Sequence, residues 1–103
     1  MKYKILQLKD FRKVEYSFMS YDYAKENDFK LSDYEVVYEG SIKETETFKA
    51  LEDLFTEFNI NRPADFKGHS LSMSDVVELD GVYYYCDTFG WEEVKWFVII
   101  TLD

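Results

Sequence analysis

Alternating apolar and polar side chains predict strands at three places in the first part of the chain. The first is Tyr3–Leu8 (YKILQL), and the second is residues 14–18, where apolar side chains alternate with Glu15 and Ser17. The third is Tyr34–Glu39 (YEVVYE), which we expect to end at Gly40. The side chains expected on one face of this third strand are Tyr34, Val36 and Tyr38.

A three-and-four spacing of large apolar side chains predicts the main helix at roughly Glu46–Phe58. Its apolar stripe consists of Phe48, Leu51, Leu54, Phe55 and Phe58. Thr45 is placed to cap the helix, and Lys49 and Asp53 form an i,i+4 pair on its polar side. A second, short helix is expected within the polar stretch Tyr21–Lys30.

The dipeptide Asp80-Gly81 between two apolar runs predicts a tight β-hairpin. Both turn positions need positive φ in a type I′ turn, which suits Asp and Gly. A two-residue turn fixes the register, so that Leu79 faces Val82 and Val76 faces Tyr85. One face of the hairpin, assigned to the core, carries Val77, Leu79, Val82, Tyr84 and Cys86. The other face mixes acids with tyrosines and carries Val76, Glu78, Tyr83, Tyr85 and Asp87.

The apolar run at Lys95–Thr101 (KWFVIIT) predicts a last strand in the middle of the sheet, because burial on both faces favours such runs. Together these elements predict an α+β fold, a mostly antiparallel β-sheet with one main amphipathic helix packed on it. The length of 103 residues favours a single domain over residues 1–103.

Composition narrows the class of protein. Hydrophobic residues make up 47% of the chain, too many for a disordered acidic segment. No signal peptide and no apolar run long enough for a membrane span is evident, and Cys86, the single cysteine, cannot form an internal disulfide. We therefore expect a cytoplasmic protein that does not contact a membrane.

The net charge of −9 is unevenly distributed. Basic residues concentrate in residues 1–13, where Asp10 is the only acid, so the remainder of the chain is more acidic than the whole. This balance argues against direct binding to nucleic acid, whose phosphates require a basic surface. It favours either a basic protein partner or simple solubility.

No enzyme signature emerges from the residues that could carry chemistry. The only histidine, His69, is adjacent to Ser70, which is a poor geometry for a catalytic triad, and Ser72 and Ser74 suit local backbone bonding. Cys86 falls on the core face of the hairpin, where a thiol is usually inert. Zinc, calcium and phosphate-loop patterns are missing, so we expect no catalytic residues, no metal and no cofactor.

One long stretch resembles a known family. Asn61–Gly81 (NRPADFKGHSLSMSDVVELDG), followed by YYYCDTFGW at 83–91 and EEV at 92–94, closely resembles the YodL-like domain. The opening YKILQLKD extends the resemblance over most of the chain, and KWFVIITLD departs from it at the end. The resemblance implies a protein carried by plasmids, conjugative elements or phages, often near genes that blunt host defence. It also implies that the GHSLS stretch is mainly structural.

This origin and the acidic charge lead to a first hypothesis, an inhibitor of a host defence nuclease. In its most specific form it is an anti-CRISPR protein that binds a type II RNA-guided effector and blocks guide-RNA or DNA binding. Carboxylates on a strand, about 6.6 Å apart on one face, could stand in for phosphates in a basic channel. The residues expected to contact the partner are Glu78, Asp80, Tyr83, Tyr85, Asp87, Trp91, Glu92 and Glu93.

Three alternatives stay open at this point. The protein could be a DNA-mimic antirestriction protein that binds a restriction enzyme, or a non-catalytic module that binds another protein of its own mobile element. An enzyme is the least favoured. The oligomeric state and the identity of the target cannot be read from the sequence.

Overall fold

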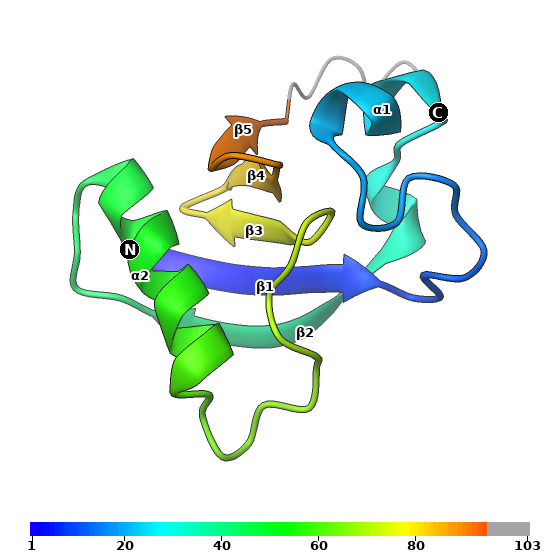
Figure 1. Ribbon diagram of the computed structural model, residues 1–103. Coiled ribbons are helices and arrows are strands. Elements are labelled where there is room, and N and C mark those ends of the chain that lie inside the picture. The colour runs from blue at the N-terminus through cyan, green and yellow to red at the C-terminus, as the bar shows by residue number, and fades with distance from the viewer. Residues whose placement is uncertain (95–103) are drawn as a thin grey trace.

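The computed structural model describes residues 1–94, and the strand expected at Lys95–Thr101 lies outside these residues. The elements in chain order are β1 (Lys2–Leu8), α1 (Tyr21–Glu26), the 3-10 turn η1 (Leu31–Asp33), β2 (Tyr34–Ser41), α2 (Thr47–Ile60), β3 (Val76–Leu79), β4 (Val82–Cys86) and β5 (Trp91–Glu93). The strands form one antiparallel sheet in the order β2-β1-β3-β4-β5, with α2 running across it (Figure 1). The predicted α+β class is confirmed.

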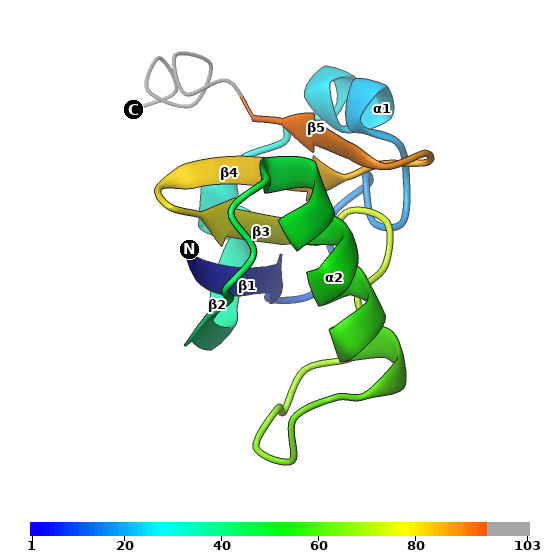
Figure 2. The ribbon, with the colours of Figure 1, turned by 90° about the vertical axis from the view of Figure 1, so that its left-hand side faces the viewer.

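Helix α2 covers one face of the sheet and makes the first core. Its buried side chains Ala50, Leu51, Leu54 and Phe58 are fully inaccessible to solvent. They pack against the α2-facing side chains of the strands, which include Tyr3, Ile5, Val77, Leu79, Tyr84, Cys86 and Trp91. Figure 2 shows the strands stacked from β2 to β5 with α2 alongside them. The helix is therefore fixed by burial of its apolar stripe.

A second core lies on the opposite face of the sheet, where residues 10–34 cover one end. Its buried side chains are Leu6, Tyr16, Tyr21, Ala24, Phe29, Tyr34, Val76, Tyr85 and Val94. Aromatic rings dominate this cluster, and they meet mostly edge to face, as in the pair formed by Phe29 and Tyr85 at 5.6 Å between centroids. Helix α1, which has six residues and lies within this segment, is therefore held by aromatic packing rather than by its own length.

The strand expected at residues 14–18 is wrong. These residues form turns, and Phe18 has a φ of 60°. The Ser17 hydroxyl donates to the carbonyls of Phe11 and Val14, which gives the backbone local partners in place of a sheet neighbour. Tyr16 is buried as expected for an apolar strand position, but it packs into the second core from a turn.

Strand β2 is present, but its predicted face is wrong. The register with β1 shifts by one residue, so that Ile5 pairs with Tyr38 and Leu6 pairs with Val36. The bulge at this point sends Tyr34 into the second core and Tyr38 towards the first. Val36, predicted to share their face, is 45% exposed.

The predicted hairpin is confirmed in turn and register. Asp80 has a φ of 48° and Gly81 a φ of 87°, as a type I′ turn requires. Leu79 pairs with Val82, and Val76 pairs with Tyr85. This agreement follows from a local signal, because a two-residue turn allows only one register.

The predicted main helix is also confirmed, with a different cap and a narrower buried stripe. The Glu46 carboxylate, rather than the Thr45 side chain, accepts hydrogen bonds from the backbone N–H groups of Phe48 and Lys49. The predicted pair of Lys49 and Asp53 is present at 3.7 Å. Two members of the predicted stripe, Phe48 and Phe55, lie at its edge and are exposed.

The short helix expected within Tyr21–Lys30 is confirmed as α1, which is capped by Ser20. Strand β5 was not predicted from the sequence. In the part of the chain that the structure describes, neither helix is long and apolar enough to cross a membrane.

Candidate functional site

Two of the predicted contact residues, Glu78 and Tyr83, lie side by side on the sheet face opposite α2. They are cross-strand partners in the hairpin, and both are partly exposed. Burial and a hydrogen bond with the Glu78 carboxylate raise the pKa of Tyr83 to about 12, so the phenol stays protonated. The pair joins an acidic group to an aromatic one, as the sequence predicts.

The same row of side chains continues across the sheet. Lys4 on β1 is opposite Glu78, and Glu39 on β2 is opposite Lys4. We call Glu39, Lys4, Glu78 and Tyr83 the hairpin row. A shallow hollow of about 320 Å³ lies over its β2 side, lined by Lys2, Tyr3, Lys4, Glu39, Gly40, Glu78, Asp80 and Gly81. The row is therefore an accessible surface on which glutamates flank one lysine.

Asp80 at the hairpin tip is exposed and also ties the hairpin to β1. Its Oδ1 accepts from the backbone N–H of Lys2 at 2.8 Å, and its own N–H donates to the Lys2 carbonyl at 2.9 Å. The structure thus places Asp80 beside the hairpin row.

The expected exposure of Tyr85 and Trp91 is wrong. Tyr85 has no exposed surface, and its hydroxyl donates to the Met19 carbonyl at 2.8 Å. Trp91 is 8% exposed, and its Nε1 donates to Glu52 Oε2 at 3.2 Å. Residues 10–34 cover one ring and α2 covers the other, which the hairpin register alone cannot reveal. Tyr85 is therefore unavailable for direct contact with a partner, and Trp91 presents only the small part of its surface that lines a groove beside α2.

The three remaining acids of the predicted set lie away from the hairpin row. Asp87 accepts hydrogen bonds from the backbone N–H groups of Tyr21 and Thr88, at 3.0 and 2.7 Å, so it anchors the start of α1. Glu92 and Glu93 are exposed on β5, where they pair with Tyr85 and Tyr84 and therefore point to opposite faces. The structure brings together Glu78, Asp80 and Tyr83, and it separates them from the other five.

The GHSLS stretch packs onto β1 through a network around Gln7. The Gln7 amide donates to the His69 carbonyl at 2.8 Å and to Asp75 Oδ2 at 3.2 Å, and its Oε1 accepts from the His69 N–H. The backbone N–H of Ser72 also donates to Asp75 Oδ2, at 2.9 Å. Gln7 and Asp75 are each 2% exposed. This network pins residues 69–75 to the sheet.

The ring of His69 is oriented by the same loop. Its Nδ1 lies 2.7 Å from the Ser70 carbonyl oxygen and 3.3 Å from Gln7 Nε2. Nε2 then faces Asp75 Oδ1 at 3.9 Å. In a serine-hydrolase triad the carboxylate binds Nδ1 and leaves Nε2 to the nucleophile, so this arrangement is not that triad.

Burial raises the pKa of Asp75 to about 7, although the Ser72 N–H, the His69 ring and the Gln7 amide each lower it. The hydroxyl oxygen of Ser72, three residues before Asp75, is buried and has no hydrogen-bond partner among the described residues. Sequence reasoning missed Gln7 because glutamine at a strand position carries no distinctive signal.

Cys86, the single cysteine of the chain, is buried. Burial raises the pKa of the Cys86 thiol to about 12, and Asp75, Glu52 and Asp87 act in the same direction. A thiol with so high a pKa is neutral and a poor nucleophile at neutral pH. Within residues 1–94 no three His, Cys, Asp or Glu side chains gather in a way that could hold a metal ion.

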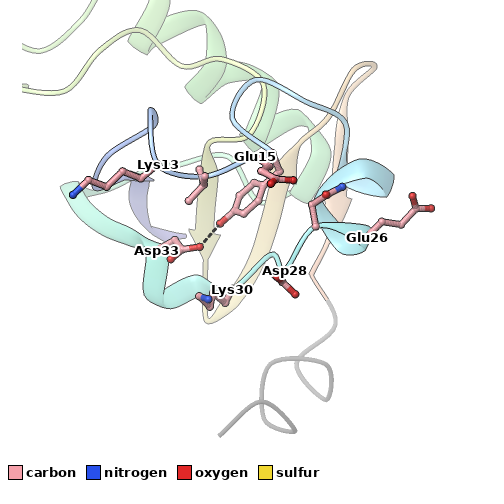
Figure 3. Close-up of a pocket in the computed structure, with 9 residues that line it drawn as sticks. Lys13, Glu15, Glu26, Asp28, Lys30 and Asp33 are labelled. Carbon is pink, nitrogen blue, oxygen red and sulfur yellow. Dashed lines mark hydrogen bonds between the residues drawn. The ribbon is translucent and has the colours of Figure 1, made fainter.

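A polar hollow of about 330 Å³ lies between the β1–α1 loop and η1. Its lining includes Tyr16, whose hydroxyl donates to Asp33 Oδ2 at 2.9 Å (Figure 3). Charges of both signs surround it, and Lys13 and Glu26 point away from each other (Figure 3). The side chains therefore do not converge on a common ligand.

A groove of about 280 Å³ lies between α2 and the β4–β5 turn. Its lining residues are Glu52, Phe55, Met73, Cys86, Asp87, Thr88, Gly90 and Trp91. Phe89, beside it in the sequence, is 94% exposed. We call this site the α2–β5 groove. The sequence predicts that Phe55 lies in the core. The signal for its exposure is the width of the apolar stripe on α2, because the sheet covers only the middle of that stripe and leaves Phe48 and Phe55 at its edges.

The comparisons with known proteins gave one match. The YodL-like domain model matches residues 2–97, which is nearly the whole chain. No curated protein and no solved structure matches. The match agrees with the motif at residues 61–81 and extends to β1 and β5. The chain belongs to the YodL-like domain family.

Proposed function

We propose that this protein acts by binding, without catalysis, and that its acidic surface occupies a basic surface of a host defence nuclease. The proposed target is a type II RNA-guided effector, whose guide-RNA or DNA binding the protein would block. The observation that carries the proposal is the acidic charge, a net of −9 on 103 residues.

The distribution of ion pairs supports this interpretation. Asp10, Asp22 and Asp53 each lie within 4.0 Å of a lysine or arginine nitrogen. Glu78 and Asp80 form no ion pair with any described residue. Unpaired exposed carboxylates contribute little to the stability of the fold, but they steer a basic partner and set its orientation.

The scale of the hairpin row suits a channel that holds a nucleic-acid backbone. Neighbouring strands lie about 4.8 Å apart, so Glu39 and Glu78, with β1 between them, are separated by roughly two strand spacings. Asp80 extends the acidic surface beyond the row. Carboxylates at such spacings could take the place of phosphates against arginine and lysine side chains.

The test is a comparison of targets with purified protein. We expect binding to the guide-free effector, weaker or no binding to the guide-loaded effector, and inhibition of DNA cleavage when the protein is added before the guide. Binding to a restriction enzyme instead would favour the antirestriction alternative. Failure to bind either nuclease would refute the proposed target class.

A second comparison tests whether catalysis contributes. His69→Ala should leave binding and inhibition unchanged, because this side chain is not placed as a nucleophile or base. Cys86→Ser should do the same, because it removes the thiol and keeps the size of a side chain that lines the α2–β5 groove. Loss of inhibition, with binding and melting temperature retained, would show that the protein acts as an enzyme.

A further inference from the structure

We propose that the α2–β5 groove is the docking site for an arginine side chain of a basic partner protein. The stem of the arginine would lie against Phe55 and Trp91, and its guanidinium group would meet the carboxylates of Glu52 and Asp87. The inference deepens the proposed function, on which it rests for the nature of the partner, and it names the contact surface.

Exposed apolar side chains around the groove mark it as a contact surface. Phe48 is 51% exposed, Phe55 36% and Phe89 94%. Phe48 and Phe55 are seven residues apart on α2, so they lie along one flank of the helix with Glu52 between them. Large aromatic side chains grouped in this way are enriched in the centres of protein interfaces.

The walls of the groove can hold the stem and the planar head of an arginine. The rings of Phe55 and Trp91 meet edge to face, with centroids 6.5 Å apart. The hydrogen bond from Trp91 Nε1 to Glu52 Oε2 fixes the indole and the carboxylate relative to each other. Guanidinium groups stack on aromatic surfaces and pair with carboxylates through two parallel hydrogen bonds.

The charge of the groove selects a basic occupant. Its charged lining residues are Glu52 and Asp87, and none of its lining residues is basic. Described residues donate to Glu52 at Oε2 and to Asp87 at Oδ1, which leaves the second oxygen of each carboxylate for a ligand. Lys49, the lysine of α2, lies 3.6 Å from Glu44 and 3.7 Å from Asp53. No cation of α2 therefore neutralises the groove.

A second copy of the chain is a poorer occupant. Two copies docked through this groove would bring the carboxylates of both together, and each copy carries a net charge of −9. Like charges brought together across an interface oppose association. An arginine-bearing partner removes this repulsion.

The test needs no nuclease. We would titrate the full-length, 15N-labelled protein with a capped peptide of alternating arginine and leucine, and follow the Trp91 indole N–H signal by NMR. The matched probes are the same peptide with citrulline, which is neutral and of similar shape, and with lysine. We expect shifts at Trp91 and at the residues lining the groove with the arginine peptide, no shifts with citrulline, and weaker binding with lysine.

The variants Glu52→Gln and Asp87→Asn keep a hydrogen-bond acceptor and remove the charge. Each should weaken the binding of the arginine peptide about tenfold, which is the effect of losing one charge-assisted hydrogen bond. The matched control is Glu35→Gln on β2, at the other edge of the sheet, which should bind as the wild type does. Equal affinity for the arginine and citrulline peptides, or equal affinity of all three variants, would overturn the proposal.

Other occupants give different results. Dimerisation of the peptide-free protein through Phe89, or NMR contacts from Phe55 to the chain's own residues outside the groove walls, would also overturn it. The two proposals fail separately. If the peptide binds but no nuclease does, the groove stands and the target fails. If the effector binds Glu52→Gln and Asp87→Asn normally, the groove fails and the proposed function stands.

Discussion

At the scale of single residues, the backbone at Gly81 is a constraint that one substitution can test. Its φ is 87°, and a Cβ built there would meet no heavy atom within 4 Å. A substitution therefore tests backbone strain alone. We expect Gly81→Val to lower the free energy of unfolding by about 1–3 kcal/mol, since β-branched residues rarely adopt this conformation.

The matched substitution is Gly81→Asn, because asparagine tolerates positive φ. It should lose clearly less stability than Gly81→Val in urea denaturation. Equal midpoints for the valine and asparagine variants would contradict the type I′ turn.

Asp75 gives a prediction about pH. Burial raises its pKa in the folded protein to about 7, above its usual 3.8. The folded state therefore holds this proton more tightly than the unfolded state does, and the contribution of Asp75 to stability falls as the pH rises from about 4 to about 7. Asp75→Asn, which cannot ionise, should remove this part of the pH dependence.

The measurement is the urea midpoint of both proteins at several pH values between 4 and 7. Other carboxylates, such as Asp10 with its lowered pKa, are common to both proteins, so the difference between the two curves reports Asp75 together with the His69 ring that faces it. The wild type should lose stability relative to the variant as the pH rises. A constant difference over this range would contradict the raised pKa.

At the scale of elements, the attachment of α2 to the sheet depends on its buried leucines. Leu54 has no exposed surface and lies in the first core. Leu54→Ala should lower the free energy of unfolding by about 2–5 kcal/mol through lost burial and the cavity left behind. Ile60→Ala, on the same helix but at a position 78% exposed, is the control and should change it by less than about 0.5 kcal/mol. Similar losses in both variants would show that α2 is not anchored through this core.

The elements that the sequence predicts correctly are those with local signals. The turn at Asp80-Gly81 sets the hairpin register, and the apolar spacing from Leu51 to Phe58 locates α2. The bulge in β2 and the turns at residues 14–18 depend on partners distant in the sequence. Alternation alone cannot distinguish a strand from a turn whose tyrosine is buried by a neighbouring segment.

In the candidate site, too, the positions set by local signals were predictable and those set by distant segments were not. Glu78 and Tyr83 follow from the register and are partly exposed as expected. Tyr85 and Trp91 are buried because residues 10–34 and α2 cover them, and no local pattern reports such tertiary cover. The exposure of Phe48 and Phe55 has the same origin, since it depends on where the sheet ends beneath α2.

At the scale of the whole molecule, exposed acids lie on two parts of the surface, and exposed aromatic side chains accompany them at one of the two. The hairpin row presents acids on the face opposite α2, and the α2–β5 groove combines acids with exposed aromatics. A basic partner that covers the groove would gain affinity from the aromatic side chains. The acids elsewhere would mainly raise the association rate.

The most direct measurement is the affinity of the purified protein for the guide-free type II effector as a function of salt. Between about 0.1 M and about 1 M salt the Debye length falls from about 10 Å to about 3 Å. Binding driven by a net charge of −9 should weaken by more than about tenfold over this range. An affinity that stays constant with salt, or no binding at low salt, would contradict an acidic protein that occupies a basic nuclease surface.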